Sequence, residues 1–144
     1  KLVMVGRLDK DKEFPKLKNL IELSGFSERV KLAGYMNDSE LIGLFKLTSA
    51  FIFLSLYEGF GLPVLEAMAA GVPVVAYNNS SIPEIVGGTF PLIESGNETA
   101  AAEKVIELLE NQSSVLDLAT KQARKFTWAA TGESTLRAYE SLIR

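Results

Sequence analysis

The sequence predicts an α/β protein built on one doubly wound parallel sheet, with three helices at its carboxy-terminal end. Two observations predict this class. Short apolar runs alternate with longer amphipathic stretches along the chain, and strands separated by helices need crossover connections, which give parallel strands. The run at 51–54 is apolar throughout, as expected for a strand buried on both faces. We expect a single domain over residues 1–144, because neither an internal repeat nor a boundary-like linker is visible.

The individual elements follow from the spacing of the apolar residues. Strands are expected at Leu2–Val5, Val30–Ala33, Ala50–Leu54, Val72–Ala76 and Phe90–Ile93. Helices are expected at Phe14–Ser24, Ser39–Leu47, Leu62–Ala70, Glu98–Glu110, Val115–Phe126 and Glu133–Ile143. In open α/β sheets, ligands bind beyond the carboxyl ends of the strands. The segments that follow the strands are therefore the places to look for a site.

The composition narrows the chemistry that this site can perform. The 144 residues include no Cys and no His, and the formal net charge is −3. A thiolate nucleophile, an imidazole base and an ordinary zinc site are therefore excluded. The basic stripe of nucleic-acid binders is missing, and the apolar runs are too short to span a bilayer. Any chemistry must rest on carboxylates, Lys, Arg, hydroxyls and backbone groups, and no cofactor is expected.

The most informative segment is EGFGLPVLEAMAAG, at 58–71. Two glycines follow a predicted strand, and a predicted helix then begins with Pro63 near its first position, where a missing N–H costs little. Glycines allow close approach of a ligand to the backbone, and the amides that begin a helix suit a phosphate. Glu58 ends the strand and Glu66 lies about one turn into the helix, so two carboxylates would face one crevice. The carboxylate of Glu66 could accept hydrogen bonds from a ribose diol.

The residues alone also allow a purely structural explanation of both acids. Glu66 fits an acid in the first turns of a helix, where the helix dipole favours negative charge. Glu58 fits a solvated charge at the end of a strand.

The string EGFGLPVLE resembles the signature, a Glu, seven residues and a second Glu, of the retaining, nucleotide-sugar-dependent glycosyltransferases with the GT-B fold (glycosyl transferases group 1). The resemblance extends in order over essentially the whole chain, through VKLAGY at 30–35, GVPVVA at 71–76, SSIPE at 80–84 and FTW at 126–128. It implies a Rossmann-like, nucleotide-sugar-binding domain, the carboxy-terminal half of a GT-B fold.

The resemblance also implies roles for individual residues. Glu58 would be the catalytic carboxylate at the donor sugar, and Glu66 would bind the ribose of the nucleotide. The amides that would contact the sugar and the diphosphate belong to Gly59, Phe60, Gly61 and Leu62. The loop that would receive the base comprises Gly34, Tyr35 and Met36. The implied reaction transfers a sugar from a nucleoside diphosphate sugar to a carbohydrate or lipid-linked acceptor, with retention and without a metal. A non-catalytic nucleotide-sugar-binding module is the alternative.

The resemblance covers only the donor half of such an enzyme. We expect the acceptor-binding amino-terminal domain to be missing. We therefore expect this fragment alone to be inactive. In the family, the donor domain opens with Gly-Arg-Leu and a Lys five residues after the Arg, which hold the diphosphate. Arg7 and Lys12 match this string, but a single helix separates them from the strand at Val30–Ala33. We therefore expect the family's first strand–helix unit to be missing and both residues to be surface charges. Arg7 as a genuine phosphate ligand is the alternative.

The remaining features have simpler explanations. Ser81 and Glu84 fit a capping box at the start of a helix. Asn78 and Asn79 follow a strand, where turn chemistry and contact with the donor sugar explain them equally well. Phe126 and Trp128 are expected to pack the last helix. The chain is expected to be cytoplasmic and without a transmembrane segment, and peripheral contact with a membrane is left open.

Overall fold

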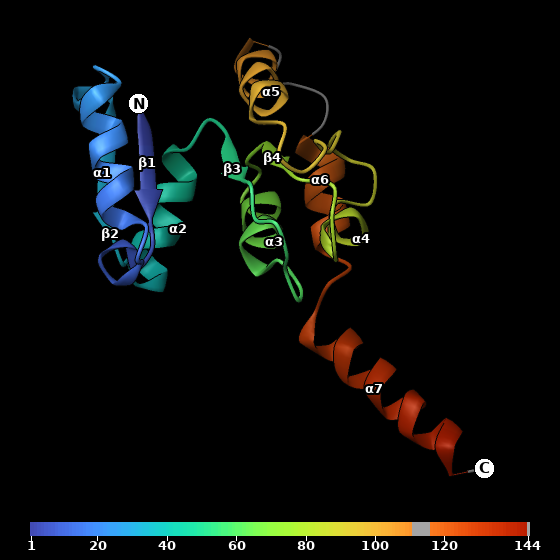
Figure 1. Cartoon of the computed structure of the whole chain (residues 1–144). Coiled ribbons are helices and arrows are strands. Elements are labelled where there is room, and N and C mark those ends of the chain that lie inside the picture. Colours follow the sequence, from blue (N-terminus) through green and yellow to red (C-terminus); the bar gives the residue numbers. More distant parts are fainter. Residues whose placement is uncertain (111–115, 144) are drawn as a thin grey trace. The chain divides into compact units, whose positions relative to one another are not determined.

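The computed structural model describes residues 1–110 and 116–143. It divides into two compact units, Lys1–Leu44 and Phe45–Arg144, whose elements are labelled in Figure 1. Each unit contains a pair of parallel strands joined by a helix. The expected α/β organisation with parallel strands is therefore present in both, although the strands of the described residues form two two-stranded sheets and not the single expected sheet.

The first unit is a strand–helix–strand crossover. Strand β1 (Leu2–Val5) pairs in parallel with β2 (Val30–Gly34), and α1 (Phe14–Leu23) connects them. The short 3-10 turns η1 (Leu8–Lys10) and η2 (Ser27–Arg29) flank that helix. Beyond the strands, the Gly6 amide donates to the Gly34 carbonyl at 2.9 Å. This contact keeps the carboxyl ends of the two strands side by side.

Helix α2 (Asp38–Leu47) begins with a capping box. The Asn37 amide donates to the Glu40 carboxylate at 2.9 Å, and the Glu40 amide donates to the Asn37 side-chain oxygen at 3.1 Å. Both donors are amides that the helix itself leaves without a partner. The helix consequently starts at Asp38, one residue before the expected Ser39.

The second unit repeats the crossover. Strand β3 (Phe51–Phe53) pairs in parallel with β4 (Val74–Ala76), and α3 (Leu62–Ala69) connects them. The prediction of a strand at Phe90–Ile93 is wrong, because only Ile93 pairs, in a parallel bridge with Tyr77. Pro91 explains the difference, since it has no N–H to donate to a ladder of strand hydrogen bonds.

Four further helices complete the second unit within the described residues: α4 (Ile82–Val86), α5 (Glu98–Glu110), α6 (Leu116–Ala123) and α7 (Trp128–Leu142). Helix α4 follows Ser81, where a helix start was expected without a range for the helix. The expected start of α6 at Val115 lies outside the described residues, and α6 ends at Ala123, before the expected Phe126.

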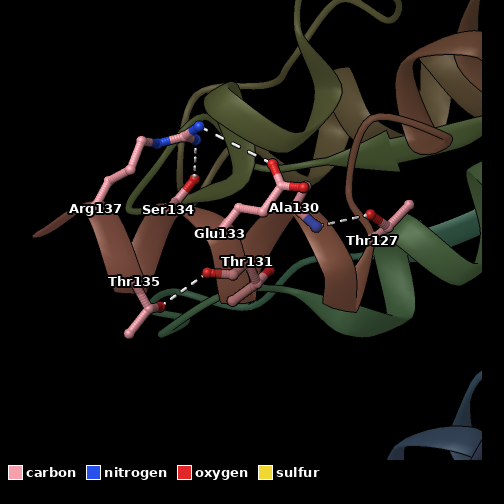
Figure 2. Close-up of polar contacts among 7 residues, drawn as sticks. All are labelled: Thr127, Ala130, Thr131, Glu133, Ser134, Thr135 and Arg137. Atoms are coloured by element: carbon pink, nitrogen blue, oxygen red, sulfur yellow. Dashed lines mark hydrogen bonds and ion pairs between the residues drawn. The ribbon is translucent and has the colours of Figure 1, made fainter.

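Helix α7 begins at Trp128, not at the expected Glu133. The stretch WAATG has a glycine and little apolar periodicity, so the pattern alone did not reveal the first turn. The side chain of Thr127 supplies the start signal, because its hydroxyl accepts a hydrogen bond from the Ala130 amide at 3.1 Å. Figure 2 shows this cap and the next turns, where Thr135 donates to the Thr131 carbonyl at 2.8 Å.

The core of the second unit lies around α3. Its largest fully buried side chains are Val64, Met68, Val74, Val75, Ile82, Ile85 and Val86. Helix α6 packs against α3 and α4 (Figure 1) and contributes two small buried residues, Ala119 and Ala123, which allow a close approach of the helices. The Thr120 hydroxyl also donates to the Met68 carbonyl at 3.3 Å. Helix α3 is therefore a firmly held element on which a site can be built.

Candidate functional site

The loop between β3 and α3 carries most of the residues that the sequence analysis singled out. It leads from Glu58 through Gly61, the N-cap of α3, whose backbone is left-handed with φ +101°. A β-carbon on Gly61 would lie 2.7 Å from Cδ1 of the buried Ile82. The carbonyl of Gly61 accepts from the amides of Val64 and Leu65 at 3.0 and 3.2 Å. Glycine is thus required here both by the backbone conformation and by the lack of space.

Four consecutive amides at this loop lack an acceptor among residues 1–110 and 116–143. Among the described residues, the amides of Gly59, Phe60, Gly61 and Leu62 donate no hydrogen bond. Pro63 follows in the first turn of α3 and has no amide hydrogen to compete for a ligand. The helix dipole places partial positive charge at the same end. The loop therefore offers a group of donors suited to an anion such as a phosphate.

A second segment, Asn79–Ser81, holds this loop by its backbone. The Glu58 amide donates to the Ser80 hydroxyl at 3.0 Å. The Ser81 hydroxyl donates to the carbonyls of Glu58 and Phe60 at 3.3 and 2.5 Å. Glu58 is therefore held through both its N–H and its C=O. The sequence analysis missed this role, although the run of short polar residues after β4 was a signal.

The same contacts correct the expected capping box. Ser81 is the N-cap of α4 by its backbone, but its side chain makes no capping hydrogen bond. The backbone of Ser81 gives the reason, because its φ of −84° and ψ of −11° are helical, whereas a capping side chain needs an extended residue at the N-cap. The hydroxyl of Ser81 turns to the loop instead.

Asn79 anchors this segment to two other loops. Its side-chain amide donates to the Ser55 carbonyl at 3.0 Å and to the Ser95 hydroxyl at 2.9 Å. Its side-chain oxygen accepts from the Ser80 hydroxyl at 3.0 Å. Both amide hydrogens are used within the protein, which favours the turn explanation of Asn79 over contact with a sugar.

The two predicted acids flank the loop. Glu58 is half-buried at its beginning, and Glu66 is exposed on α3. The structure thus brings six of the predicted site residues together in one stretch of the second unit, and these are Glu58, Gly59, Phe60, Gly61, Leu62 and Glu66.

The predicted base-binding loop belongs to the first unit. Gly34, at the end of β2, has a left-handed backbone with φ +72°. Tyr35 is 67% exposed, and the Arg7 guanidinium lies over its ring, 5.4 Å from the centroid. Met36 is half-buried and Lys12 is exposed. A meeting of Gly34, Tyr35 and Met36 with the loop of Glu58 stays a prediction, as do both roles considered for Arg7.

The two aromatic residues that were expected to pack the last helix behave differently. The Phe126 ring meets the Phe60 ring edge to face, with 6.0 Å between centroids, so Phe126 packs against the loop of the candidate site. The prediction for Trp128 is wrong, because its side chain is 86% exposed. Trp128 opens α7, a helix with no buried residue.

Behind the loop, Tyr77 is buried and its hydroxyl donates to the Glu98 carboxylate at 3.3 Å. Burial and the neighbouring Glu98 carboxylate raise the pKa of the Tyr77 phenol above its ordinary value. The neutral phenol is therefore favoured in the folded state, and folding opposes its ionisation. This contribution to stability is complete below about pH 10, the pKa of a free tyrosine, and is lost as pH rises through the folded-state pKa.

We therefore predict that Tyr77→Phe loses less of its free energy of unfolding at alkaline pH than the wild-type protein does. Denaturant unfolding of the wild-type protein, Tyr77→Phe and Tyr57→Phe between pH 7 and 11 measures this. Tyr57, which is 80% exposed, is the matched control. Tyr77→Phe should be somewhat less stable than the wild-type protein at pH 7, because it lacks the hydrogen bond to Glu98. It should lose less stability than the wild-type protein above pH 10. Parallel pH profiles for all three proteins would contradict the prediction.

Among residues 1–110 and 116–143, no group of three or more His, Cys, Asp or Glu side chains is arranged to hold a metal ion. Within the same residues, no helix combines the length and the apolar character needed to cross a bilayer.

Known proteins share the sequence and the fold. The chain is 36% identical over 117 residues to O-antigen chain mannosyltransferase B of Escherichia coli. The match covers 78% of this chain and 30% of that protein. It is 31% identical over 131 residues to the MMP alpha-(1->4)-mannosyltransferase of Mycolicibacterium hassiacum, covering 86% and 32%. The chain thus spans about a third of the length of these relatives.

Among solved structures, a glycosyltransferase from Rickettsia africae superposes with a TM-score of 0.85 at 22% identity, over 99% of this chain and 40% of that one. Sucrose-phosphate synthase from Thermosynechococcus elongatus gives 0.83 at 22% identity, over 99% and 38%. These likenesses confirm the expected Rossmann-like architecture of GT-B glycosyltransferases. The sequence model of the family "Glycosyl transferases group 1" matches residues 1–126. The chain therefore belongs to the group 1 glycosyl transferases.

Proposed function

We propose that this chain is the donor-binding part of a glycosyltransferase that moves a sugar from a nucleoside diphosphate sugar to an acceptor with retention of configuration. Glu58 acts at the donor sugar and Glu66 binds the ribose. The amides of Gly59, Phe60, Gly61 and Leu62 bind the sugar and the diphosphate. The loop of Gly34, Tyr35 and Met36 receives the base.

The group of four unpaired amides at the start of α3 carries this proposal. The diphosphate of a nucleotide sugar needs several hydrogen-bond donors and a positive potential around it. The leaving group in sugar transfer is itself a nucleoside diphosphate. Amides already held in place stabilise the charge that develops on that leaving group. The two carboxylates on either side of the amides suit the sugar hydroxyls and the ribose diol.

The names of the relatives guide the choice of sugar and acceptor. Two relatives are named as mannosyltransferases and one of these acts on an O-antigen chain, so a mannose conjugate is the first donor to test and a polysaccharide the first acceptor. We propose that acceptor binding is supplied from outside these 144 residues, as is the family's first strand–helix unit, and that the chain transfers nothing alone. Cytoplasmic location stays a prediction.

The proposal predicts that Glu66→Ala weakens donor binding. The full-length protein is titrated calorimetrically with UDP, GDP, ADP and their common sugar conjugates. One nucleotide should bind, and Glu66→Ala should weaken it about 10- to 100-fold, the range for losing hydrogen bonds to a charged group. Glu103→Ala, which removes another exposed helical carboxylate of the second unit, should bind as the wild type does.

Two results separate the alternatives. Equal affinities of Glu66→Ala, Glu103→Ala and the wild type would remove Glu66 from the site. Binding of a nucleotide sugar that is weakened by Glu66→Ala, without transfer to any acceptor by the full-length protein, would instead favour a non-catalytic nucleotide-sugar-binding module.

A further inference from the structure

Both hydroxyl protons of the segment Asn79–Ser81 are used in hydrogen bonds within the protein. A serine hydroxyl has one proton to donate. Ser80 donates its proton to the Asn79 side chain at 3.0 Å, and Ser81 donates its proton to the loop carbonyls of Glu58 and Phe60. Neither serine side chain therefore keeps a proton to donate to a sugar or a phosphate, and both hydroxyls serve to hold the loop.

The backbone of Ser80 points to the same conclusion. Its φ of +44° makes it the one non-glycine residue with a positive φ in the part of the chain that the structure describes. An L-residue adopts this conformation at a cost that glycine avoids. Glycine, however, would not provide the hydroxyl that accepts the Glu58 amide at 3.0 Å. The strained backbone is thus maintained together with a side-chain contact to the loop.

These contacts hold the loop at its beginning and in its middle. Asn79 binds the Ser55 carbonyl ahead of the loop, and Ser80 and Ser81 hold the two backbone groups of Glu58. Ser81 also binds the Phe60 carbonyl, which lies between the amides of Phe60 and Gly61. Because these bonds restrict the rotation of successive peptide planes, they orient the amides and the direction in which the Glu58 side chain leaves the backbone.

We infer that Asn79, Ser80 and Ser81 are positioning residues of the donor site. This inference rests on the proposed function, since it assigns a purpose to the rigidity of that same loop. The side chains of the three residues have no proton left to give to the donor. They hold Glu58 and the loop amides in place before the donor arrives, so that binding and transfer need little rearrangement.

Ser80→Gly and Ser81→Ala in the full-length protein test this inference. Ser80→Gly suits the positive φ and removes only the hydroxyl, so it should fold. Thr89→Val is the matched control, because the Thr89 hydroxyl donates to the Val86 carbonyl at 2.7 Å, a bond of the same kind outside the loop. Each loop variant should lower kcat for sugar transfer about tenfold, the fold-change that corresponds to one hydrogen bond. Amide hydrogen exchange at residues 58–62 should accelerate. Thr89→Val should change neither quantity.

The remaining outcomes are distinct from one another. Wild-type kcat in Ser80→Gly and Ser81→Ala would overturn the inference and leave the proposed function intact. A kcat lowered to the same degree in Thr89→Val would also overturn it, because general loss of stability would then explain the effect. Absence of nucleotide binding by the wild-type protein would remove the proposed function, and the inference with it.

Discussion

Replacing Gly61 by alanine is expected to lower the free energy of unfolding by about 3 kcal/mol, combining a strained left-handed alanine with a crowded core. The added β-carbon would lie 2.7 Å from Cδ1 of Ile82 and 3.3 Å from Cδ1 of Ile85. Both isoleucines are 1% exposed, so neither side chain can move away without disturbing the packing around α3. Equilibrium unfolding in urea measures the change, and a Tm lower by about 10 °C should accompany it.

Gly59→Ala is the matched control, because a β-carbon at Gly59 meets no atom within 4 Å. It should change the free energy of unfolding by less than about 0.5 kcal/mol, as is usual for open positions. The same methyl group would enter the space from which a diphosphate must approach the loop, so Gly59→Ala should weaken donor binding. Equal stability of Gly61→Ala and Gly59→Ala would show that α3 does not depend on a glycine N-cap.

Replacing Glu58 by glutamine in the full-length protein is expected to lower kcat for sugar transfer about 100- to 1,000-fold, as does loss of one electrostatic group in other active sites. Glutamine keeps the shape of the side chain, and the backbone bonds of Glu58 to Ser80 and Ser81 stay available. Only the charge at the donor sugar is removed. The donor KM should change little, because the proposed function assigns most of the donor binding to the loop amides and Glu66.

Glu94→Gln provides the control for this measurement. Glu94 is an exposed carboxylate of the same unit, and its replacement should leave kcat unchanged. Initial rates with saturating acceptor and varied donor separate kcat from KM. A kcat for Glu58→Gln within threefold of the wild type would show that Glu58 is not a catalytic residue.

The order of the elements followed from the sequence. Apolar runs with helical spacing between them predicted β1, α1, β2, α2, β3, α3 and β4 to within two residues at each end, because buried strands and amphipathic helices must be apolar where they pack. The segment at 58–66 placed Pro63 at a helix start and Glu66 about one turn into that helix, which the structure confirms. Glu58 was expected at a strand end, but β3 ends at Phe53 and Glu58 lies in the loop.

The local signals were misleading where two interactions competed for one group. Ser81 and Glu84 had the spacing of a capping box, but the backbone of Ser81 is helical and its hydroxyl binds the loop. The actual capping box at Asn37 and Glu40 passed unnoticed. Likewise, Pro91 reduced an apolar run to a single bridge, although apolar content alone predicted a strand.

The sequence by itself determined the fold class, the family and the residues of the loop, because these depend on composition and spacing along the chain. Only the tertiary structure showed what holds the loop in place. Ser80 lies 22 residues from Glu58 along the chain, and no periodicity relates two loops that meet only when β3 and β4 pair. The requirement for glycine at position 61 is of the same kind, because it arises from the buried side chain of Ile82 on another helix.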